Sequence, residues 1–186
     1  MFIEKTEKET ILKPLQIVTG IVERKQTLPI LSNVLIEKEA DKIRFTATDL
    51  EIQITTIIQK ISSNEETCAI TVGGKKIQDI LRILPDQSKV SVELKENKAI
   101  IKCDKSKFSL QTLPAQDFPK LSSQLENAKK IVLSQSKLKN LLESVQYAMA
   151  QQDVRYYLNG VLLIIENNKL KVVATDGHRL AYNEDL

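Results

Sequence analysis

The side chains that could perform chemistry gather at few places in this chain. The single histidine, His178, follows Asp176 in the segment Thr175–Leu180. A Ser-His-Asp hydrolase would need a nucleophile on a strained turn, and the sequence has no Gly-x-Ser-x-Gly motif. A metal site would need more ligands than one histidine and one carboxylate. We therefore interpret His178 as a turn residue that hydrogen-bonds locally, and keep catalysis or metal binding as the less favoured alternative.

A second candidate is the segment Gly73-Gly74-Lys75-Lys76, which precedes an expected helix. Glycines before a helix can cradle phosphate, but the segment lacks the Gly-x4-Gly-Lys-Ser/Thr spacing of nucleotide-binding loops. The alternative is a plain glycine turn followed by two lysines. Because a helix N-terminus favours anions, these lysines are better explained as solvated charges or as charges directed at an external polyanion.

The two cysteines, Cys68 and Cys103, are far apart, and neither belongs to a Cys-x-x-Cys pair. A zinc site is therefore not predicted, and cysteine usage suits a reducing cytosol better than a disulfide scaffold. The N-terminus shows no apolar signal segment, and no stretch approaches the roughly 20 apolar residues of a membrane helix. We expect a cytoplasmic protein.

Composition indicates a folded protein without a strong charge signature. Hydrophobic residues make up 42% of the 186 residues, which is enough for a sizeable core and excludes intrinsic disorder. The net charge of +3 is too small to indicate nucleic acid by itself, but it allows positive charge on one surface. Tryptophan is absent and aromatic residues make up only 4%, so base stacking on aromatic side chains is not favoured.

Hydrophobic periodicity predicts an α+β fold. Helices are expected over Thr10–Val22, Lys75–Leu84 and Ser136–Met149, where apolar residues recur every three or four positions. Strands are expected in segments rich in Ile, Val and Thr. The expected strands are Phe2–Lys5, Leu28–Lys38, Lys42–Ile61, Val90–Lys95, Ala99–Cys103, Phe108–Leu113, Lys130–Leu133, Tyr156–Ile165 and Lys169–Thr175.

The order strand, helix, strand, strand starts again near residue 128, after a polar stretch at Ser122–Asn127 that suggests a linker. Ala47-Thr48-Asp49 matches Ala174-Thr175-Asp176 at an offset of 127, and the helices match at 126. Chance similarity between apolar strands is the alternative. We interpret the pattern as two copies of one α+β unit, of which the second is cut short.

Charge differs between the expected elements. The expected helices are mildly basic, whereas acidic residues gather in the strand regions, as at Glu37, Glu39 and Glu51. If these helices lie on one face of the protein, that face would attract phosphate groups without distinguishing one base from another. The alternative is an ordinary solvated helix face.

Several longer motifs resemble the bacterial replicative sliding clamp family, the beta subunit of DNA polymerase III, and the similarity covers essentially the whole chain. The motifs are Thr27–Leu31, Thr48–Glu51, Phe108–Pro114, Asp117–Pro119, Gln152–Gly160 and Ala174–Ala181.

The resemblance implies a DNA clamp fold of repeated domains, with helices on the inner face of a ring and antiparallel sheets outside. Residues 1–125 would be clamp domain I, and residues 126–186 the first half of domain II. The family has three such domains per chain and closes as a head-to-tail homodimer. The chain would then be an amino-terminal fragment, which we expect not to dimerise as the full-length protein does.

The resemblance also implies residues that contact DNA. Lys25 falls on a basic position in the loop after the first helix, beside Arg24, and Gln152 falls on a polar position before the paired tyrosines. As an alternative for the tyrosines, one would be buried and one exposed along a strand. The predicted DNA-contacting residues are Lys13, Arg24, Lys25, Lys75, Lys76, Arg82, Lys139, Gln152, Tyr156 and Tyr157.

Two protein-binding surfaces are implied as well. One wall of a hydrophobic cleft for short peptides would consist of Arg155, Leu158, Thr175, Gly177, His178, Arg179 and Leu180. The dimer interface would use an edge strand with Phe108 and Leu110. Its charged partners would be Lys98, Lys105 and Lys107, which pair less rigidly with carboxylates than arginines would.

The implied function is that of a non-catalytic processivity factor without cofactor or metal. Its partners would be duplex DNA, bound without sequence preference, and peptides of DNA polymerases and of the clamp loader. Two alternatives stay open from the residues alone. One is an enzyme acting on a phosphate-bearing substrate through Gly73–Lys76 and the turn with Asp176 and His178; the other is a plain α+β interaction module.

Overall fold

The computed structural model describes residues 2–22, 28–39, 42–59, 67–121, 132–166 and 169–185. The chain divides into two compact units, Met1–Ser123 and Gln124–Leu186. Each unit has its own hydrophobic core.

The described part of the first unit combines helices with antiparallel strands, as predicted. The strands form one sheet in the order β1-β6-β7-β8-β5-β2-β3-β4. The elements are β1 (Ile3–Glu7), α1 (Lys8–Val18), β2 (Asn33–Glu39), β3 (Lys42–Thr48), β4 (Gln53–Gln59), β5 (Cys68–Gly73), α2 (Gly74–Ile83), β6 (Lys89–Lys95), β7 (Lys98–Cys103) and β8 (Ser106–Leu113).

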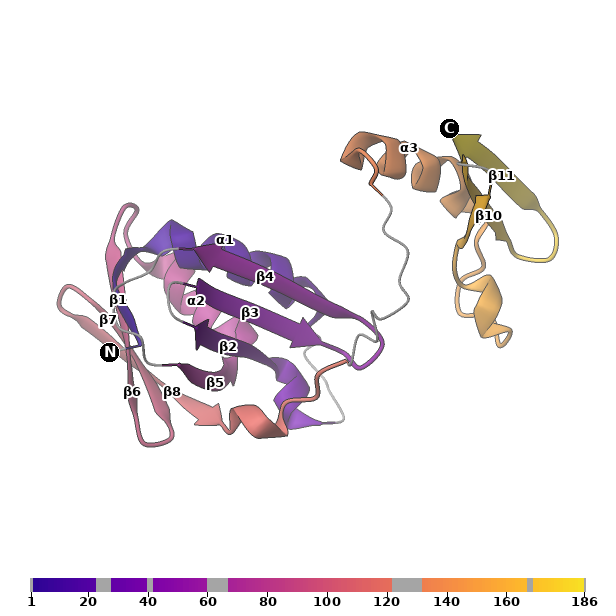
Figure 1. Cartoon of the computed structure of the whole chain (residues 1–186). Helices are drawn as coiled ribbons and strands as arrows, with labels where there is room; N and C mark the ends of the chain where they lie inside the picture. Colours follow the sequence, from indigo (N-terminus) through magenta and orange to yellow (C-terminus); the bar gives the residue numbers. More distant parts are fainter. Residues whose placement is uncertain are drawn as a thin grey trace. The chain divides into compact units, whose positions relative to one another are not determined.

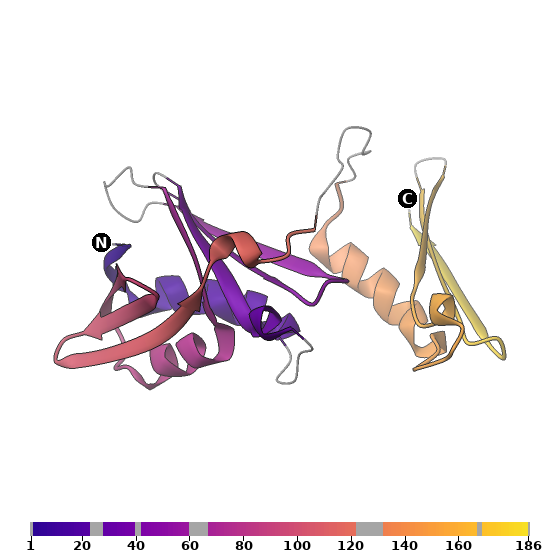
Figure 2. The same cartoon turned by 90° about the horizontal axis from the view of Figure 1, so that it is seen from below.

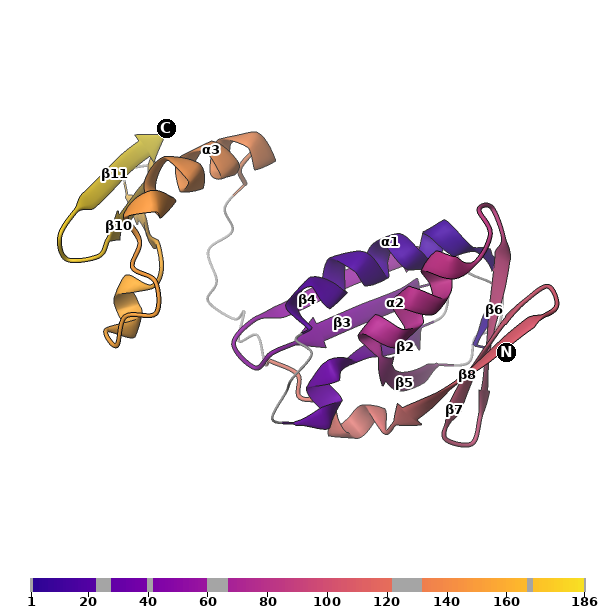
Figure 3. The same cartoon turned by 180° about the vertical axis from the view of Figure 1, so that it is seen from behind.

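Both helices of the first unit lie on the same face of the sheet formed by β2 to β5 (Figures 1 and 3). Helix α1 packs on β3 and β4, α2 packs on β2 and β5, and the two helices touch. Strands β1, β6 and β7 contribute to the same core, in which Ile11, Ile36, Ile77 and Val92 are buried. One core therefore fixes the helices against both halves of the sheet.

Helix α2 follows the predicted pattern. Ile77 and Leu81 are buried, whereas Lys75 and Lys76 on the opposite side are exposed. Pro85 follows the helix, as expected for a residue that cannot continue it. In the described ranges, no helix is long and apolar enough to cross a membrane.

Two predicted strands of the first unit differ from the structure, and a third strand was not predicted. The expected strand over Leu28–Lys38 begins as a 3-10 turn at Pro29–Ser32, because proline at the start favours a turn. The stretch expected over Lys42–Ile61 is the hairpin of β3 and β4, and its residues 60 and 61 lie outside the described residues. Strand β5, which pairs with β2 and ends at Gly73, was not expected, because only a glycine turn was predicted before the helix.

The described part of the second unit repeats half of the first. Its elements are α3 (Gln135–Val145), β9 (Leu162–Glu166), β10 (Lys169–Thr175) and β11 (Leu180–Asp185), with the strand order β11-β10-β9. Helix α3 packs against β10 and β11 (Figure 2). Leu141, Val145 and Val172 are in its core.

The element bounds support the internal repeat. Helix α1 begins at Lys8 and α3 at Gln135, 127 residues later, and the same displacement separates the first residues of β3 and β10, Lys42 and Lys169. The offset of 127 thus holds for the helices too, and the offset of 126 expected there is wrong.

Other expectations for the second unit are wrong. Of the strand expected over Lys130–Leu133, residues 130 and 131 lie outside the described residues, and Val132 and Leu133 are not in a strand. Strand β1, at the same place in the first unit, depends on pairing with β6, and the described residues of the second unit contain no such partner. The strand expected from Tyr156 begins only at Leu162, because Tyr156–Leu158 form a 3-10 turn. Strand β11 was not expected at all.

Candidate functional site

The turn between β10 and β11 carries most of the predicted cleft residues and is closed by its own side chains. The Thr175 hydroxyl donates to the carbonyl oxygen of Arg179 (2.6 Å) and accepts from the amide of Gly177 (3.1 Å). The Asp176 carboxylate accepts from the amides of His178 and Arg179, both at 2.9 Å. These backbone hydrogen bonds, first that from Arg179, lower the pKa of Asp176.

The turn of Thr48–Ile52 between β3 and β4 has the same construction. The Thr48 hydroxyl donates to the carbonyl oxygen of Ile52 (2.8 Å) and accepts from the amide of Leu50 (3.0 Å). Asp49 accepts from the amides of Glu51 and Ile52 at 3.0 and 2.7 Å. The repeated Ala-Thr-Asp motif therefore encodes one hydrogen-bonded turn, used twice.

Arg155 connects the loop before β9 to the Thr175–Leu180 turn. Its Nε and Nη2 atoms donate to the two oxygens of Asp153 at 3.0 and 2.8 Å, and Nη2 also approaches the carbonyl oxygen of Asp176 (3.4 Å). The paired guanidinium is the main cause that lowers the pKa of Asp153 to about 2. The same bond raises the pKa of Arg155.

Asn159 fixes the loop that contains this ion pair. Its side-chain oxygen accepts from the amide of Asp153 (3.0 Å), and its side-chain nitrogen donates to the carbonyl oxygen of Asp153 (2.9 Å). Both contacts lie within the segment Gln152–Gly160. The sequence interpretation missed Asp153 and Asn159, although an aspartate two residues before an arginine is a detectable signal for such a pair.

Tyr156 and Tyr157 are both exposed, with 83% and 69% of their surface accessible. The alternative that one of them is buried is therefore wrong, because they lie on a 3-10 turn and not on a strand with alternating faces. Their rings meet edge to face, with centroids 6.0 Å apart. Gln152 is exposed and adopts a positive φ of 56° in the same loop.

The structure brings Arg155, Thr175, Gly177 and Arg179 together. Arg179 also bonds Asp176 through Nε (3.0 Å) and lies 6.0 Å from the Tyr147 ring centroid. The other three predicted cleft residues lie in the same two loops, where Leu158 is half-buried and His178 and Leu180 are exposed. Among the described residues, no group of three or more His, Cys, Asp or Glu side chains could hold a metal ion.

The predicted DNA-contacting residues of the helices are exposed, but they differ in their partners. Lys75 Nζ donates to the carbonyl oxygen of Thr19 at the end of α1 (3.1 Å), and Lys139 Nζ lies 3.7 Å from Glu143. Lys13, Lys76 and Arg82 are exposed on α1 and α2. Arg24 and Lys25 lie outside the described residues.

The glycines before α2 have a packing role. A Cβ atom on Gly74 would lie 2.9 Å from Cγ2 of Val34 and 3.1 Å from Cγ2 of Thr19, so the helix approaches β2 as closely as a glycine allows. Gly73 ends β5. The geometry therefore explains Gly74 by close packing of the helix on the sheet and gives no support to a phosphate cradle.

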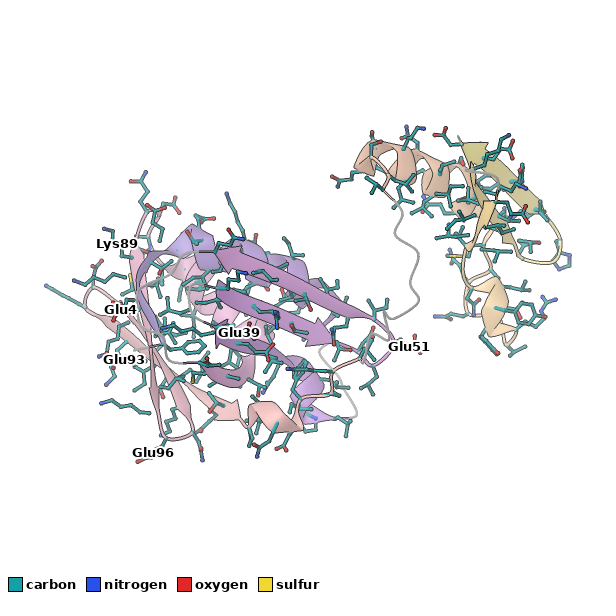
Figure 4. All side chains as sticks on the ribbon, in the orientation of Figure 1. Glu4, Glu39, Glu51, Lys89, Glu93 and Glu96 are labelled. Atoms are coloured by element: carbon teal, nitrogen blue, oxygen red, sulfur yellow. The ribbon has the colours of Figure 1, made fainter. Side chains whose placement is uncertain are left out.

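Acidic side chains project from the strand layer, as expected from the sequence. Glu39 lies at the end of β2, Glu51 in the β3–β4 turn and Glu96 in the β6–β7 turn (Figure 4). The β6–β8 segment departs from this trend, because residues 89–113 contain six lysines, including the predicted interface lysines, against three acidic residues.

Strand β8 has an open edge along its first part. It pairs with β7 from Ser106 to Gln111, and with β5 only at Thr112 and Leu113. Phe108 and Leu110 are half-buried against the core of the first unit. The predicted interface lysines, Lys98, Lys105 and Lys107, are exposed on β7, β8 and the turn between them.

A groove of about 590 Å³ lies where β8 separates from β5. Its lining includes Leu110 and Gln111 of β8, and Lys75 and Lys76 at the start of α2. These two lysines therefore lie beside the predicted interface strand, although they were predicted to contact DNA.

Comparisons with known proteins agree on one family. Residues 2–122 match the family described as DNA polymerase III beta subunit, N-terminal domain, and residues 132–185 match its central domain. The chain is 46% identical over 175 residues to the beta sliding clamp of Pseudomonas putida and 42% identical to that of Escherichia coli. In both cases the match covers 94% of this chain and 47% of the relative, so the chain spans about half the length of these relatives.

Solved structures give the same result. The crystal structure of the DNA polymerase III subunit beta from Pseudomonas aeruginosa superposes with a TM-score of 0.92 at 43% identity, over 96% of this chain and 48% of that one. A sliding clamp from the same species bound to griselimycin superposes with a TM-score of 0.85, over the same shares of both chains. The predicted clamp fold is thereby confirmed.

Proposed function

The chain belongs to the DNA polymerase III beta subunit family, and we propose that it forms part of a sliding clamp, a ring that encircles duplex DNA and tethers a DNA polymerase. The observation that carries the proposal is the match of its two units to consecutive domains of one clamp family. In this proposal residues 1–125 are one clamp domain and residues 126–186 belong to a second. The protein acts in the cytoplasm, without catalysis, cofactor or metal.

The proposed mechanism is topological. A closed ring cannot leave duplex DNA without opening, so each contact with a phosphate can stay weak. Contacts from exposed residues such as Lys13, Arg82 and Gln152 carry no sequence information, which lets the ring slide. A cleft on the second unit binds peptides of polymerases and of the clamp loader. Tethering then raises the effective concentration of polymerase at the primer end.

We further propose that the open edge of β8 is the subunit interface of a head-to-tail homodimer. Free backbone groups at a strand edge can pair with a strand of another subunit. Phe108 and Leu110 would add apolar contact, and the neighbouring lysines would select an acidic partner surface. In this proposal the partner surface belongs to the family's third domain, and the two units match only the N-terminal and central domains, so we expect the 186-residue chain to be monomeric. Sedimentation at micromolar concentration tests this, and a dimer would contradict it.

DNA binding can be tested by titrating the 15N-labelled chain with a 20-bp duplex at several salt concentrations. Association should weaken with salt and be insensitive to sequence. Arg82→Gln should reduce the slope of log K against log salt by about 1, because one phosphate contact is lost. The matched control is Lys105→Gln, which changes the net charge equally but lies on the turn before β8. Equal effects of the two variants would contradict the assignment of Arg82.

Peptide binding can be tested with griselimycin, which a Pseudomonas aeruginosa clamp binds. Addition should shift the amide signals of the Thr175–Leu180 turn, and Leu158→Ala and His178→Ala should weaken the interaction. Glu184→Gln, in the same unit but on β11, is the control. Shifts confined to other parts of the chain would contradict the cleft.

A further inference from the structure

A buried lysine and a cysteine lie opposite each other on two neighbouring strands of the first unit. Strands β2 and β5 are adjacent in the sheet (Figure 1), and their register places Lys38 directly opposite Cys68. We propose that Cys68 is a site of oxidation by hydroperoxides, and that the Lys38 ammonium pairs with the anionic sulfinate formed there. This inference concerns the first unit by itself and does not depend on the proposed clamp function.

Both side chains lie on the face of the sheet that carries the helices. Side chains alternate between the two faces of a strand, and Val34 and Ile36, which have the same parity as Lys38, are in the core of the first unit. Cys68 also packs against that core, in step with Ile70. Directly opposite residues of an antiparallel pair have Cβ atoms about 4.5–5.5 Å apart. The lysine and the thiol therefore share one local environment.

Lys38 lacks a counter-charge. It is only 2% exposed, and no hydrogen bond or ion pair joins it to another residue in the described parts of the chain. Its neighbours Glu37 and Glu39 alternate to the opposite face of β2, where they lie 3.8 and 3.5 Å from Arg44. On the β3 side, the residue opposite Lys38 is the apolar Ile43. Because a desolvated ammonium without a partner is unfavourable, a new anion beside it would be stabilised.

Oxidation of Cys68 supplies that anion. The side chain is half-buried at the start of β5, so a small hydroperoxide can reach its sulfur. The sulfur attacks one oxygen of hydrogen peroxide and is oxidised by two electrons to sulfenic acid, while the O–O bond breaks and the departing hydroxide takes the thiol proton to leave as water. The neighbouring ammonium stabilises the negative charge that develops on sulfur as this proton leaves. A second hydrogen peroxide gives sulfinic acid in the same way, with a second water, and at neutral pH this acid loses its proton to solvent and is a sulfinate anion.

The first test follows the reaction of the 186-residue chain with hydrogen peroxide by mass spectrometry of the two cysteine-containing peptides. The Cys68 peptide should gain one and then two oxygen atoms, faster than the peptide of Cys103, which is 3% exposed and lies opposite Ser106. In Lys38→Leu, which adds no oxidisable side chain, the reaction at Cys68 should be about two- to five-fold slower, the range of an exposed ion pair. Lys42→Leu removes an exposed lysine of the opposite face and should leave the rate unchanged. An unchanged rate in Lys38→Leu, or faster oxidation of Cys103, would overturn the proposal.

The second test asks whether the sulfinate is paired with Lys38, and uses Cys103→Ala protein so that only one thiol reacts. Urea unfolding of the first unit, followed by far-UV circular dichroism, is compared before and after peroxide. With Lys38 present, the oxidised protein should keep or raise its midpoint. In Lys38→Leu the same oxidation should lower the midpoint, because the half-buried anion has no partner. Lys38→Gln, which also lacks the charge, takes its place if Lys38→Leu does not fold. An equal fall of the midpoint with and without Lys38 would overturn the pairing.

Discussion

The buried ammonium of Lys8 joins the two helices of the first unit, and its removal gives a sharp stability prediction. Lys8 is the first residue of α1 and only 3% exposed. Its Nζ donates to the carbonyl oxygen of Leu84, the residue after α2 (3.0 Å), and to the carboxylate of Asp86 (2.8 Å). A cation at this position also complements the helix dipole of α2. Lys8→Met keeps the aliphatic stem and removes these bonds.

The expected loss of stability follows from the Leu84 carbonyl group, which keeps its buried position but loses its hydrogen-bond donor. Hydrogen bonds to charged groups contribute about 1.5–3 kcal/mol, and a buried carbonyl without a partner costs a similar amount. Relief of the desolvated ammonium offsets part of this. We therefore expect Lys8→Met to lower the free energy of unfolding of the first unit by about 2 kcal/mol. Lys8 lowers the pKa of Asp86, but that carboxylate is exposed, so Asp86→Asn should have a smaller effect.

The assay can separate the two units. All four tyrosines lie in the second unit, so tyrosine fluorescence reports only on it, whereas far-UV circular dichroism reports on both. In urea, a loss of about 2 kcal/mol should move the midpoint of the first unit by about 1 M and leave the tyrosine transition unchanged. The control is Lys13→Met on the exposed side of α1, with an effect below about 0.5 kcal/mol. Equal stability of the two variants would refute the reasoning.

Three further predictions concern other parts of the chain. Gly74→Ala should destabilise the first unit by about 1–3 kcal/mol in urea titrations, because the added methyl group meets Val34; a stabilised variant would contradict this packing. Asp49→Ala should lower the free energy of unfolding of the first unit by about 1 kcal/mol, by analogy with a lost helix cap. It should also speed hydrogen exchange at the Ile52 amide, and unchanged exchange would argue against the hydrogen-bonded turn. Asp153 has a folded pKa of about 2, below its unfolded value near 3.9. Its contribution to the stability of the second unit is therefore complete above about pH 4 and lost as the pH falls toward 2. Unfolding of the second unit, followed by tyrosine fluorescence, should lack this contribution to the pH dependence in Asp153→Asn.

Local patterns were sufficient to predict the helices and the repeat. Ile77 and Leu81 lie four residues apart on a helix that buries one face, and this spacing is readable without tertiary information. The three-stranded run from β6 to β8 was also predictable, because short turns at Glu96 and Asp104 separate its strands. The repeated Ala-Thr-Asp motif located both copies of the unit.

What could not be predicted depends on partners distant in sequence. Strand β5 pairs with β2, and its run Ile70-Thr71-Val72 is suited to a strand, but the run is only three residues long and ends at glycine, so the sequence interpretation gave weight to the turn alone. Val132 is apolar and suited to a strand, but it has no neighbouring strand in the described part of its unit and is 81% exposed. In the candidate site, the resemblance indicated Arg155 but not its partner. The position of Asp153 two residues earlier makes it a candidate, but only the shape of the loop determines that the two pair.

In the hydrogen-bonded turn that occurs in both units, the side chains that hold the backbone differ from those that point outward. Threonine and aspartate side chains close each turn, so the three residues that follow the aspartate need not hold it together. One copy displays Leu50 and Ile52 at these positions, and the other displays Gly177 and Arg179. A duplicated scaffold of this kind can acquire a new binding preference by changing outward side chains alone, while its backbone stays the same.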